Sequence, residues 1–257
     1  MYREKFDLAG STAVVTGGGR GIGLASAEAL AEHGARVVLC DYNQEALESG
    51  RAALSAKGYK AKIIHLDVTK AADVRRVADE LNAAGGQVDI MIANAGVAHP
   101  DTAAEAMPDE DWLRVIDINL NGVFWCCREF GKHMVARRRG AMVTIGSMSG
   151  LISNKPQRQA HYNASKAAVH HLTRSLAGEW AEFGVRVNAI APTYIDTAMS
   201  RDGFDDPTLF PTWMDFTPMK RVGRADEIAS IVLFLASEAS SVMTGSVIVA
   251  DAGYTIW

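Results

Sequence analysis

Residues 12–23 read TAVVTGGGRGIG, and this stretch decides the fold that we predict for the chain. The apolar and β-branched run at residues 12–16 is typical of a strand, and an alanine-rich helical pattern follows the glycines as far as His33. Glycines let a backbone approach a pyrophosphate closely, and the next helix offers unpaired N–H groups and the positive end of its dipole. The stretch therefore predicts a strand, a phosphate-binding turn and a helix. A merely structural turn is the alternative, because the Gly-xxx-Gly-x-Gly spacing is not the common dinucleotide fingerprint.

A second strand, expected at residues 36–40, ends in Asp41, about where a dinucleotide-binding fold places the acid that binds the adenosine ribose. A carboxylate at this point can accept hydrogen bonds from both ribose hydroxyls and would repel a 2′-phosphate. Asp41 therefore predicts NAD as the cofactor in preference to NADP, whereas Arg20 argues weakly in the opposite direction.

Strand and helix patterns alternate along the rest of the chain. We expect helices at residues 43–57, 71–83, 109–135, 162–183 and 226–236, and strands at residues 62–66, 88–93, 141–145, 186–190 and 246–250. Repeated strand–helix units imply a parallel sheet with right-handed crossovers. The predicted fold class is α/β, a single-domain Rossmann-type doubly wound parallel sheet flanked by helices on both faces. Asp67 and Asn94 follow two of its strands, where ligands bind, although each alone also suits a turn cap.

Composition limits the class of protein. With 48% apolar and 22% charged residues, the 257-residue chain suits one large domain, with a cofactor half at about residues 1–145 and a catalytic and substrate part at about residues 146–257. The net charge of -4 disfavours a nucleic-acid partner. Neither residues 1–10 nor any later run of about 18 residues is apolar enough for a leader or a membrane span, so we expect a cytoplasmic protein without a membrane partner.

Cysteine and histidine spacing gives no sign of a metal centre. Cys40, Cys126 and Cys127 fall inside apolar patterns, so we expect reduced, buried thiols. The histidines at positions 133, 161, 170 and 171 lack the spacing of a metal site, and we therefore expect no catalytic metal.

Tyr162 and Lys166 are the strongest candidates for chemistry. In a helix they share one face, because residues four apart stack above one another. A free phenol ionises near pH ~10, and a nearby ammonium lowers that pKa by roughly 1–3 units, so the pair can shuttle a proton. An ordinary amphipathic helix is the alternative for this spacing alone. Ser147 and Ser149 follow the strand at residues 141–145, which brings two hydroxyls to the same edge of the sheet.

Asn119 lies among apolar residues of the helix expected at residues 109–135. Asn is mildly unfavourable in a helix interior, and a buried Asn needs hydrogen-bond partners. It therefore either bridges backbone or water in a network or faces the solvent.

Five motifs occur together: Thr16-Gly17-Gly18-Gly19-Arg20-Gly21-Ile22-Gly23, Asn94-Ala95-Gly96, Asn119, Ser147 and Tyr162-Asn163-Ala164-Ser165-Lys166. In this order and spacing they resemble the short-chain dehydrogenase/reductase family, and the match covers essentially the whole chain. The resemblance implies an NAD(P)-dependent enzyme that oxidises CH–OH groups or reduces the corresponding ketones.

The resemblance also implies catalytic roles. Tyr162 would be the acid/base, and Lys166 would lower its pKa and bind the nicotinamide ribose. Asn119 would anchor a water on the proton path. Ser147 would hydrogen-bond the reacting oxygen. We choose it over Ser149, which has the commoner distance to the tyrosine, because Ser147 directly follows the strand.

The expected cofactor contacts are the family's positions in the glycine turn, the strand ends, the helix of Tyr162 and the segment after the strand at residues 186–190. They are Gly17, Arg20, Gly21, Ile22, Gly23, Asp41, Asp67, Val68, Asn94, Ala95, Gly96, Tyr162, Lys166, Pro192, Ile195 and Thr197. Two positions depart from the family pattern. Ala93 replaces the usual first Asn before Asn94, and Thr193 stands where Gly is common.

Residues 193–224 would form the family's lid over the substrate, without regular structure. The aromatic residues of this lid segment are Phe204, Phe210, Trp213 and Phe216, which suit a substrate cover, a core or an interface. Residues 253–257 form a short apolar end that needs burial, and the family is commonly tetrameric, so we expect a homotetramer. Some relatives hold a structural divalent ion near their C-termini, and this possibility stays open.

The expected substrate is a polyol or its ketose. The loop at residues 146–150, Asn154, Gln159 and the chain end are similar to the family's polyol dehydrogenases, those of the galactitol type especially. Ser147, Ser149, Asn154, Gln159 and Tyr162 would contact a chain of hydroxyls, whereas solvated loop residues are the alternative for the polar trio. A 3-oxoacyl thioester reductase and a non-catalytic nucleotide-sensing protein are the other hypotheses. The intact Ser147, Tyr162 and Lys166 disfavour the sensor.

Overall fold

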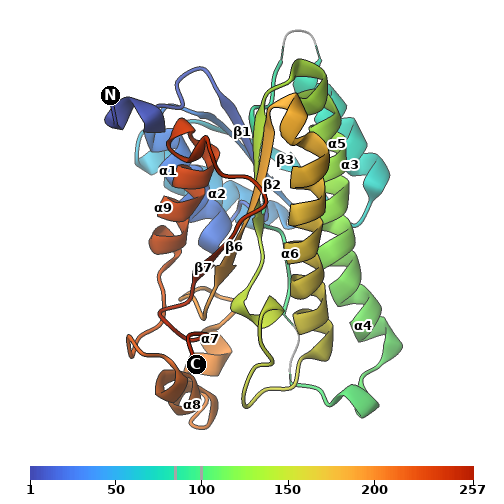
Figure 1. Ribbon diagram of the computed structural model, residues 1–257, viewed down its shortest axis with the longest axis vertical. Helices are drawn as coiled ribbons and strands as arrows, with labels where there is room; N and C mark the ends of the chain where they lie inside the picture. Colours follow the sequence, from blue (N-terminus) through green and yellow to red (C-terminus); the bar gives the residue numbers. More distant parts are fainter. Residues whose placement is uncertain (84–85, 99–100) are drawn as a thin grey trace.

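The β-branched and apolar runs of the sequence form a parallel sheet. In the computed structural model, which describes residues 1–83, 86–98 and 101–257, seven strands form one sheet in the order β3-β2-β1-β4-β5-β6-β7 (Figure 1). The strands are β1 Thr12–Thr16, β2 Arg36–Asp41, β3 Ala61–His65, β4 Ile90–Ala93, β5 Gly140–Ile145, β6 Val185–Pro192 and β7 Val247–Ala250. All six pairings are parallel. The strand order reverses between β1 and β4, which is where a sheet of this kind opens a crevice for ligands.

Helices cover both faces of the sheet, because successive residues of a strand point to opposite sides. In β1, Val14 joins one apolar cluster, whereas Ala13 and Val15 join the other. The first cluster includes side chains of α3 Ala71–Asn82, α5 Gly122–Arg137 and α6 Ala160–Trp180, and the second those of α1 Gly21–Glu32, α2 Gln44–Ala56 and α9 Ala225–Ala236. Figure 1 shows these two helical layers on either side of the strands. The predicted doubly wound α/β fold is confirmed.

Two expected elements differ from the observed ones for local reasons. The strand predicted from residue 88 begins at Ile90, because the Val88 N–H donates to the side chain of Asn82 (3.2 Å) and not to a neighbouring strand. The helix predicted at residues 109–135 consists of α4 Asp109–Ile116, a π-helical turn η3 Asp117–Asn121 and α5. A π-helical turn inside a longer helix is frequent at functional sites, and this one contains Asn119.

The prediction that the lid segment lacks regular structure was wrong. It contains α7 Arg201–Phe204 and α8 Leu209–Phe216. Asp206 Oδ1 accepts hydrogen bonds from the backbone N–H groups of Thr208 (2.7 Å) and Leu209 (2.9 Å), which satisfies donors at the start of α8. Trp213 is buried and packs edge-on against Phe204, with ring centroids 6.2 Å apart. Tertiary packing of aromatic side chains therefore stabilises helices that are too short to form alone.

The remaining regular elements are short turns. They are the 3₁₀ turns η1 Arg3–Phe6, η2 Ala104–Ala106, η4 Met148–Gly150, η5 Ala181–Phe183 and η6 Glu238–Ser240. Within the described residues, no helix is both long enough and apolar enough to cross a bilayer. Cys40, Cys126 and Cys127 are buried free thiols, as predicted, and burial raises the pKa of Cys40 and of Cys127 to about 12.

Candidate active site

The glycine turn after β1 is shaped by close backbone contacts. Gly21 opens α1 with a φ of +55°, a conformation that side chains disfavour. A Cβ at Gly23 would lie 2.1 Å from the Gly17 carbonyl oxygen, so only glycine fits there. The Asn94 amide donates to the carbonyl oxygens of Thr16 (2.9 Å) and Gly17 (3.0 Å), and thereby ties the turn to the loop after β4. Asn94 thus holds the neighbouring loops together.

Two carboxylates stand beside this turn, at the carboxyl ends of β2 and β3. The register pairs Thr16 with Cys40, so Asp41 lies next to the start of the turn. Asp41 Oδ2 accepts from the Gly19 N–H (3.2 Å), and Asp67 Oδ1 accepts from the Thr69 N–H (3.0 Å). The glycine turn, the N-terminus of the twelve-residue α1 and these carboxylates fit the pyrophosphate and adenosine of a dinucleotide.

The other predicted cofactor contacts follow β1, β3 and β4, at the carboxyl ends of these strands. Val68 is buried, Ala95 donates its N–H to Thr16 Oγ1 (3.2 Å), and Arg20 is exposed at the N-cap of α1. A Cβ on Gly96 would lie 3.3 Å from Asn119 Oδ1 and 3.5 Å from Lys166 Nζ, so Gly96 passes between these two groups. Glycine at this position therefore keeps the loop after β4 close to the candidate catalytic residues.

The start of the lid segment crosses the amino end of α1. Pro192 ends β6, and Ile195 is buried in the core. The Thr197 methyl would lie 3.3 Å from a Cβ placed on Gly21. The Thr193 hydroxyl is buried and accepts or donates no hydrogen bond within the described residues. The segment that departs from the family pattern at Thr193 thus borders the glycine turn.

Helix α6 presents Tyr162 and Lys166 to the end of β5. Lys166 is buried, and its ammonium donates to the Ile145 carbonyl oxygen (2.9 Å) and lies 5.6 Å from the centroid of the Tyr162 ring. Burial lowers the pKa of Lys166 to about 8. Burial raises the pKa of Tyr162, and a hydrogen bond with the Ser147 side chain acts in the opposite direction. Of the two serines in this loop, Ser147 is the one whose side chain influences the Tyr162 phenol.

The net upward shift of the Tyr162 pKa differs from the shift that the Tyr-xxx-Lys spacing predicts. The physical reason is that the Lys166 ammonium is directed at a main-chain carbonyl of β5 and lies over the face of the ring, while burial disfavours the phenolate. The pair is on one helix face, as predicted, and the neutral phenol is the favoured form.

Asn119 is completely buried, which excludes the solvent-facing alternative. Its Oδ1 accepts from the Val97 N–H (2.8 Å), and its Nδ2 donates to the Val97 carbonyl (2.9 Å) and to Ser165 Oγ (3.3 Å). The π-helical turn thus places the Asn119 amide so that it links the loop after β4 to Ser165 of α6. Ser165 is the residue before Lys166.

The predicted substrate trio forms one polar network with the catalytic serine candidate. Ser147 Oγ donates to Ser149 Oγ (3.1 Å), and the Gln159 amide lies 3.4 Å from Ser149 Oγ. The same Gln159 amide lies 3.2 Å from Asn154 Oδ1. Ser149 and Asn154 are buried, so these side chains form a preorganised polar wall and not a solvated loop.

Three further residues extend this wall to the lid segment, namely Gln157, Tyr194 and Trp213. Sequence reasoning did not single out the first two. Asn154 Nδ2 (3.2 Å) and Gln157 Nε2 (2.9 Å) both donate to the Tyr194 hydroxyl. Trp213 Nε1 donates to Gln157 Oε1 (3.1 Å), and its indole stacks on Tyr194 at 3.8 Å between ring centroids. Among the lid aromatics, the sequence pointed to Trp213. The position of Tyr194, two residues after the end of β6, was the signal that could have identified it.

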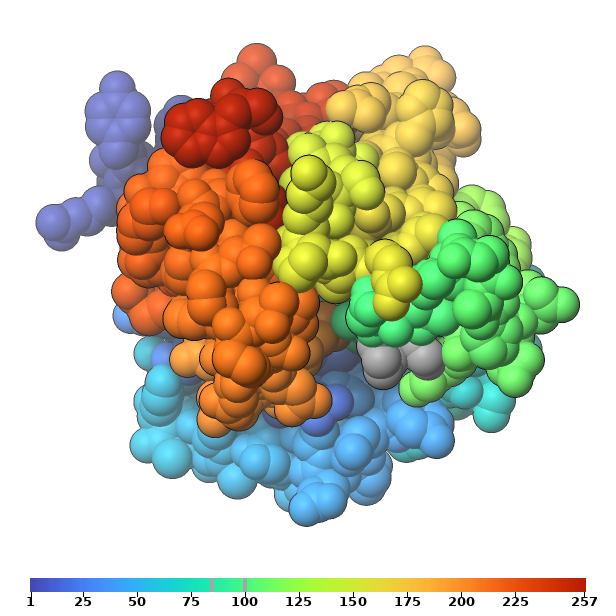
Figure 2. All heavy atoms as spheres, turned by 90° about the horizontal axis from the view of Figure 1, so that it is seen from below, coloured from blue at the N-terminus to red at the C-terminus, as the bar shows by residue number. Residues whose placement is uncertain are grey.

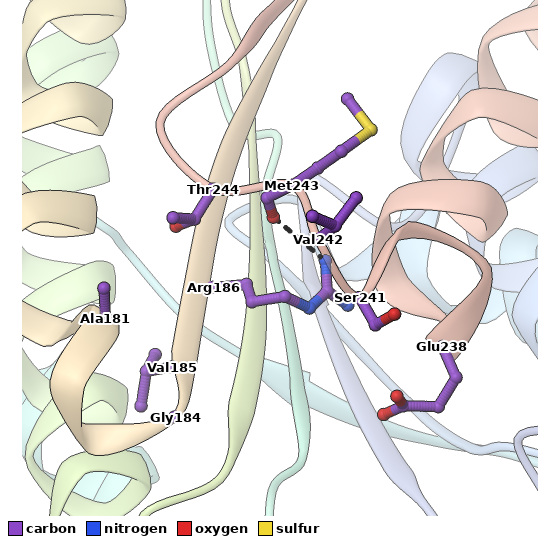
Figure 3. A pocket seen from close by; sticks show the side chains of 9 residues that line it. All are labelled: Ala181, Gly184, Val185, Arg186, Glu238, Ser241, Val242, Met243 and Thr244. Atoms are coloured by element: carbon purple, nitrogen blue, oxygen red, sulfur yellow. Dashed lines mark hydrogen bonds between the residues drawn. The ribbon is translucent and has the colours of Figure 1, made fainter.

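Figure 2 shows this face of the molecule, with the lid segment in orange beside the yellow-green loop after β5. Deep-blue atoms from an early part of the chain are visible at the bottom of the hollow between the lid segment and the light-blue segments, whereas the first residues project at the upper left of the view. A separate cavity of about 300 Å³ lies at the opposite edge of the sheet, where β6 begins (Figure 3). The Arg186 guanidinium there donates to the carbonyl oxygens of Ser237 and Ser240. Its N–H groups are therefore used in hydrogen bonds to the main chain.

Comparison with known proteins agrees with this geometry. Residues 17–255 match the family model described as enoyl-(acyl carrier protein) reductase. A galactitol 2-dehydrogenase of Rhizobium johnstonii is 52% identical over 256 residues, which cover 100% of this chain and 99% of that protein. The chain belongs to the short-chain dehydrogenase/reductase family. The resemblance on which the sequence analysis relied is confirmed, and this short-chain dehydrogenase/reductase is an oxidoreductase that acts with a nicotinamide cofactor.

Other relatives of this short-chain dehydrogenase/reductase include the galactitol 2-dehydrogenase (L-tagatose-forming) of Cereibacter sphaeroides, which is 48% identical with coverage of 100% of this chain and 99% of the relative. The solved structure of gox2181 superposes with a TM-score of 0.98 at 47% identity and covers 100% of both chains. A gluconate 5-dehydrogenase of Burkholderia cenocepacia, solved in complex with NADP and tartrate, gives a TM-score of 0.94 at 34% identity and covers 100% of both chains.

Proposed function

We propose that this protein is an NAD-dependent polyol dehydrogenase, which interconverts a secondary hydroxyl of an open-chain polyol and the ketone of the corresponding ketose. The observation that carries the proposal is the polar wall of Ser149, Asn154 and Gln159 beside Ser147, in which Ser149 and Asn154 are buried. A chain of hydroxyls needs such partners, whereas a sterol or acyl chain needs mainly apolar walls. The names of the relatives with about half of their residues identical support the same substrate class.

The residues of the site divide the proton chemistry between them. In the direction of reduction, the Tyr162 hydroxyl donates its proton to the substrate carbonyl oxygen, while the Ser147 hydroxyl hydrogen-bonds that oxygen. The raised pKa of Tyr162 keeps the phenol protonated for this step. In the direction of oxidation, the Tyr162 oxygen receives the proton of the alcohol. A bound nicotinamide dinucleotide supplies the hydride donor or acceptor.

Lys166 and Asn119 support the tyrosine. The buried ammonium of Lys166 is fixed by the Ile145 carbonyl beside the ring of Tyr162, and we assign it to the nicotinamide ribose, as the family resemblance implies. Asn119 fixes Val97 and Ser165, and Ser165 Oγ in turn donates to the Tyr162 carbonyl (2.7 Å). We assign Asn119 to the proton path between Lys166 and the solvent, as the family resemblance implies.

Asp41 supports NAD as the preferred cofactor. Its carboxylate is fixed by the N–H groups of Gly19 (3.2 Å) and Asn43 (3.0 Å). It therefore stands where the adenosine ribose of a dinucleotide bound at the glycine turn would lie. A fixed carboxylate there repels a 2′-phosphate. A relative of known structure was solved with NADP, so the preference for NAD must be tested on this protein.

We also propose a cytoplasmic homotetramer. Ile256 and Trp257 are 68% and 79% exposed on the single chain, which supports burial of the chain end against another subunit. Light scattering on the eluted protein should give about four times the 27.6 kDa of one chain. A monomeric mass would reject the proposal. Within the described residues, no group of three potential ligand side chains gathers.

A 3-oxoacyl thioester reductase is the second candidate, because the matching family model is described as an enoyl-(acyl carrier protein) reductase, whose name also points to an acyl thioester as substrate. A turnover screen separates the two candidates. It pairs hexitols, pentitols, ketoses and acetoacetyl thioesters with NAD and NADP in both reduced and oxidised forms. We expect the highest kcat/KM for a polyol with NAD, or for its ketose with NADH. A higher value for an acyl thioester than for every polyol and ketose would favour the second candidate.

A further inference from the structure

His170 is a buried residue of α6 that has no part in the proton chemistry described above. It lies one helical turn after Lys166 and two after Tyr162, so the three side chains form one stripe. This stripe faces the carboxyl end of β5. Lys166 donates to the Ile145 carbonyl, and His170 Nε2 accepts from the backbone N–H of Ser147 at 3.4 Å. The imidazole thus contacts the loop that carries the catalytic serine candidate.

The loop is built around this imidazole. A Cβ on Gly146 would lie 2.2 Å from His170 Nε2, and a Cβ on Gly150 would lie 2.8 Å from His170 Cε1. On its other side, the Gly146 N–H donates to the Ile190 carbonyl of β6 (2.8 Å). The two glycines therefore let the backbone close on the ring, which explains why the Gly-Ser-Met-Ser-Gly loop begins and ends with glycine.

The hydrogen bond to Ser147 requires a neutral ring whose Nε2 carries no proton. Burial, Lys166 and Arg174, in that order, lower the pKa of His170 to about 4, so the neutral ring is the form at physiological pH. The proton then resides on Nδ1, which is buried and has no hydrogen-bond partner in the described part of the chain. A buried donor without a partner destabilises a fold, so stability alone does not account for histidine at this position.

We propose that His170 is a positioning residue, which fixes the backbone of the loop at residues 146–150 so that the Ser147 hydroxyl faces Tyr162. It acts through the Ser147 N–H and through contact with Gly146 and Gly150. The inference rests on the proposed role of Ser147, and it adds the residue that orients it. An error of even one ångström in such an orientation costs considerable rate.

The test compares two substitutions of matched length. His170→Gln can place an amide oxygen near the Nε2 position, whereas His170→Met has a similar size and no strong acceptor. We expect kcat with the best substrate of the screen to fall about tenfold or more in His170→Met, and to stay within roughly threefold of wild type in His170→Gln. KM for the cofactor should be unchanged in both. His171→Met, a change at an exposed neighbour on the same helix, should leave kcat unchanged.

Two outcomes would overturn the inference. The first is a wild-type kcat in His170→Met, and the second is an equal loss in folded His170→Gln and His170→Met. Ser147→Ala is measured alongside, because near-normal turnover in that variant contradicts the proposed function and not the contact of His170. A measurement on the wild-type protein guards against misfolded variants. Nitrogen-15 NMR at neutral pH should show His170 as the neutral Nδ1–H tautomer, and a charged or Nε2–H ring would refute the inference.

Discussion

The hydroxyl of Tyr162 is the atom on which the proposed chemistry depends. Replacing Tyr162 by Phe removes the transferable proton and keeps the ring, so kcat should fall at least ~10²-fold while cofactor affinity is largely retained. Steady-state kinetics and a cofactor titration measure the two quantities. Turnover close to wild type would show that another group transfers the proton.

The two serines of the loop after β5 provide an internal control. Ser147 shares a hydrogen bond with Tyr162, whereas Ser149 contacts Ser147 and Gln159. Ser147→Ala should therefore lower kcat by roughly 10²-fold, and Ser149→Ala should lower it far less on a substrate with a single hydroxyl. The reverse order would mean that Ser149 hydrogen-bonds the reacting oxygen.

Asp41 should determine the choice of cofactor. Asp41→Asn removes the charge and keeps one oxygen, which can accept from one of the two N–H groups, of Gly19 and Asn43, that now donate to separate carboxylate oxygens, so the turn should stay largely intact. The ratio of kcat/KM for NAD to that for NADP should fall by roughly tenfold or more, because the repulsion of the 2′-phosphate disappears. A wild-type enzyme that prefers NADP would show that the charge of Asp41 does not control recognition.

The stability of the fold should depend on pH through His170. Its folded pKa of about 4 lies below the ordinary value of 6.5, so between these values the unfolded chain binds a proton that the folded chain does not. The free energy of unfolding therefore falls as the pH is lowered through this window, by roughly 3 kcal/mol in total from this group. Urea unfolding at several pH values should show that the free energy of unfolding depends less steeply on pH in His170→Met than in the wild-type protein. Equal slopes in both proteins would be inconsistent with a neutral buried imidazole.

At the scale of elements, the loop after β5 and the lid segment act as one unit through the hydroxyl of Tyr194. Asn154 and Gln157 donate to this hydroxyl from the loop, and Trp213 of α8 stacks on the ring and bonds Gln157. Both ends of the Asn154 amide are thus held by protein groups. The side chain is therefore oriented before any ligand arrives, which reduces the entropy lost on binding.

Asn154 should matter more for a polyol than for a simple secondary alcohol. Asn154→Ala should weaken transition-state binding of the polyol by about 1–3 kcal/mol, because a substrate hydroxyl loses its partner. The simple alcohol should lose little. Tyr194→Phe, which breaks the bond to Asn154 but keeps the ring on Trp213, is the control for the lid. Equal losses of kcat/KM on both alcohols in Asn154→Ala would mean that Asn154 only shapes the loop.

Elements with strong local signals could be predicted from the sequence. The run at residues 12–16 and the glycines that follow determine β1 and the start of α1 without help from distant residues. The helices α7 and α8 could not be predicted, because Phe204 and Trp213 become helical through contact with each other and with Tyr194. The π-helical turn at Asn119 likewise follows from hydrogen bonds to Val97 and Ser165, which are distant in sequence.

At the scale of the whole molecule, the sheet order brings together side chains from β1 through β6 at one edge. Asp41 ends one strand of this sheet, and Asn94 and Ser147 each follow another, so strand prediction alone was enough to place these three near one another. The orientation of each group was not predictable. The direction of the Lys166 ammonium toward Ile145 and the contact of His170 with Ser147 depend on how α6 packs against β5.

The central claim is that this fold carries out NAD-dependent oxidation of a polyol. The most direct test is the kcat/KM of the purified wild-type enzyme for galactitol with NAD, measured beside the same polyol with NADP and beside a simple secondary alcohol with NAD. We predict that galactitol or another hexitol with NAD gives the highest value, with Tyr162→Phe reduced at least ~10²-fold under the same conditions. Turnover of the simple alcohol above that of every polyol, or a preference for NADP, would contradict the claim.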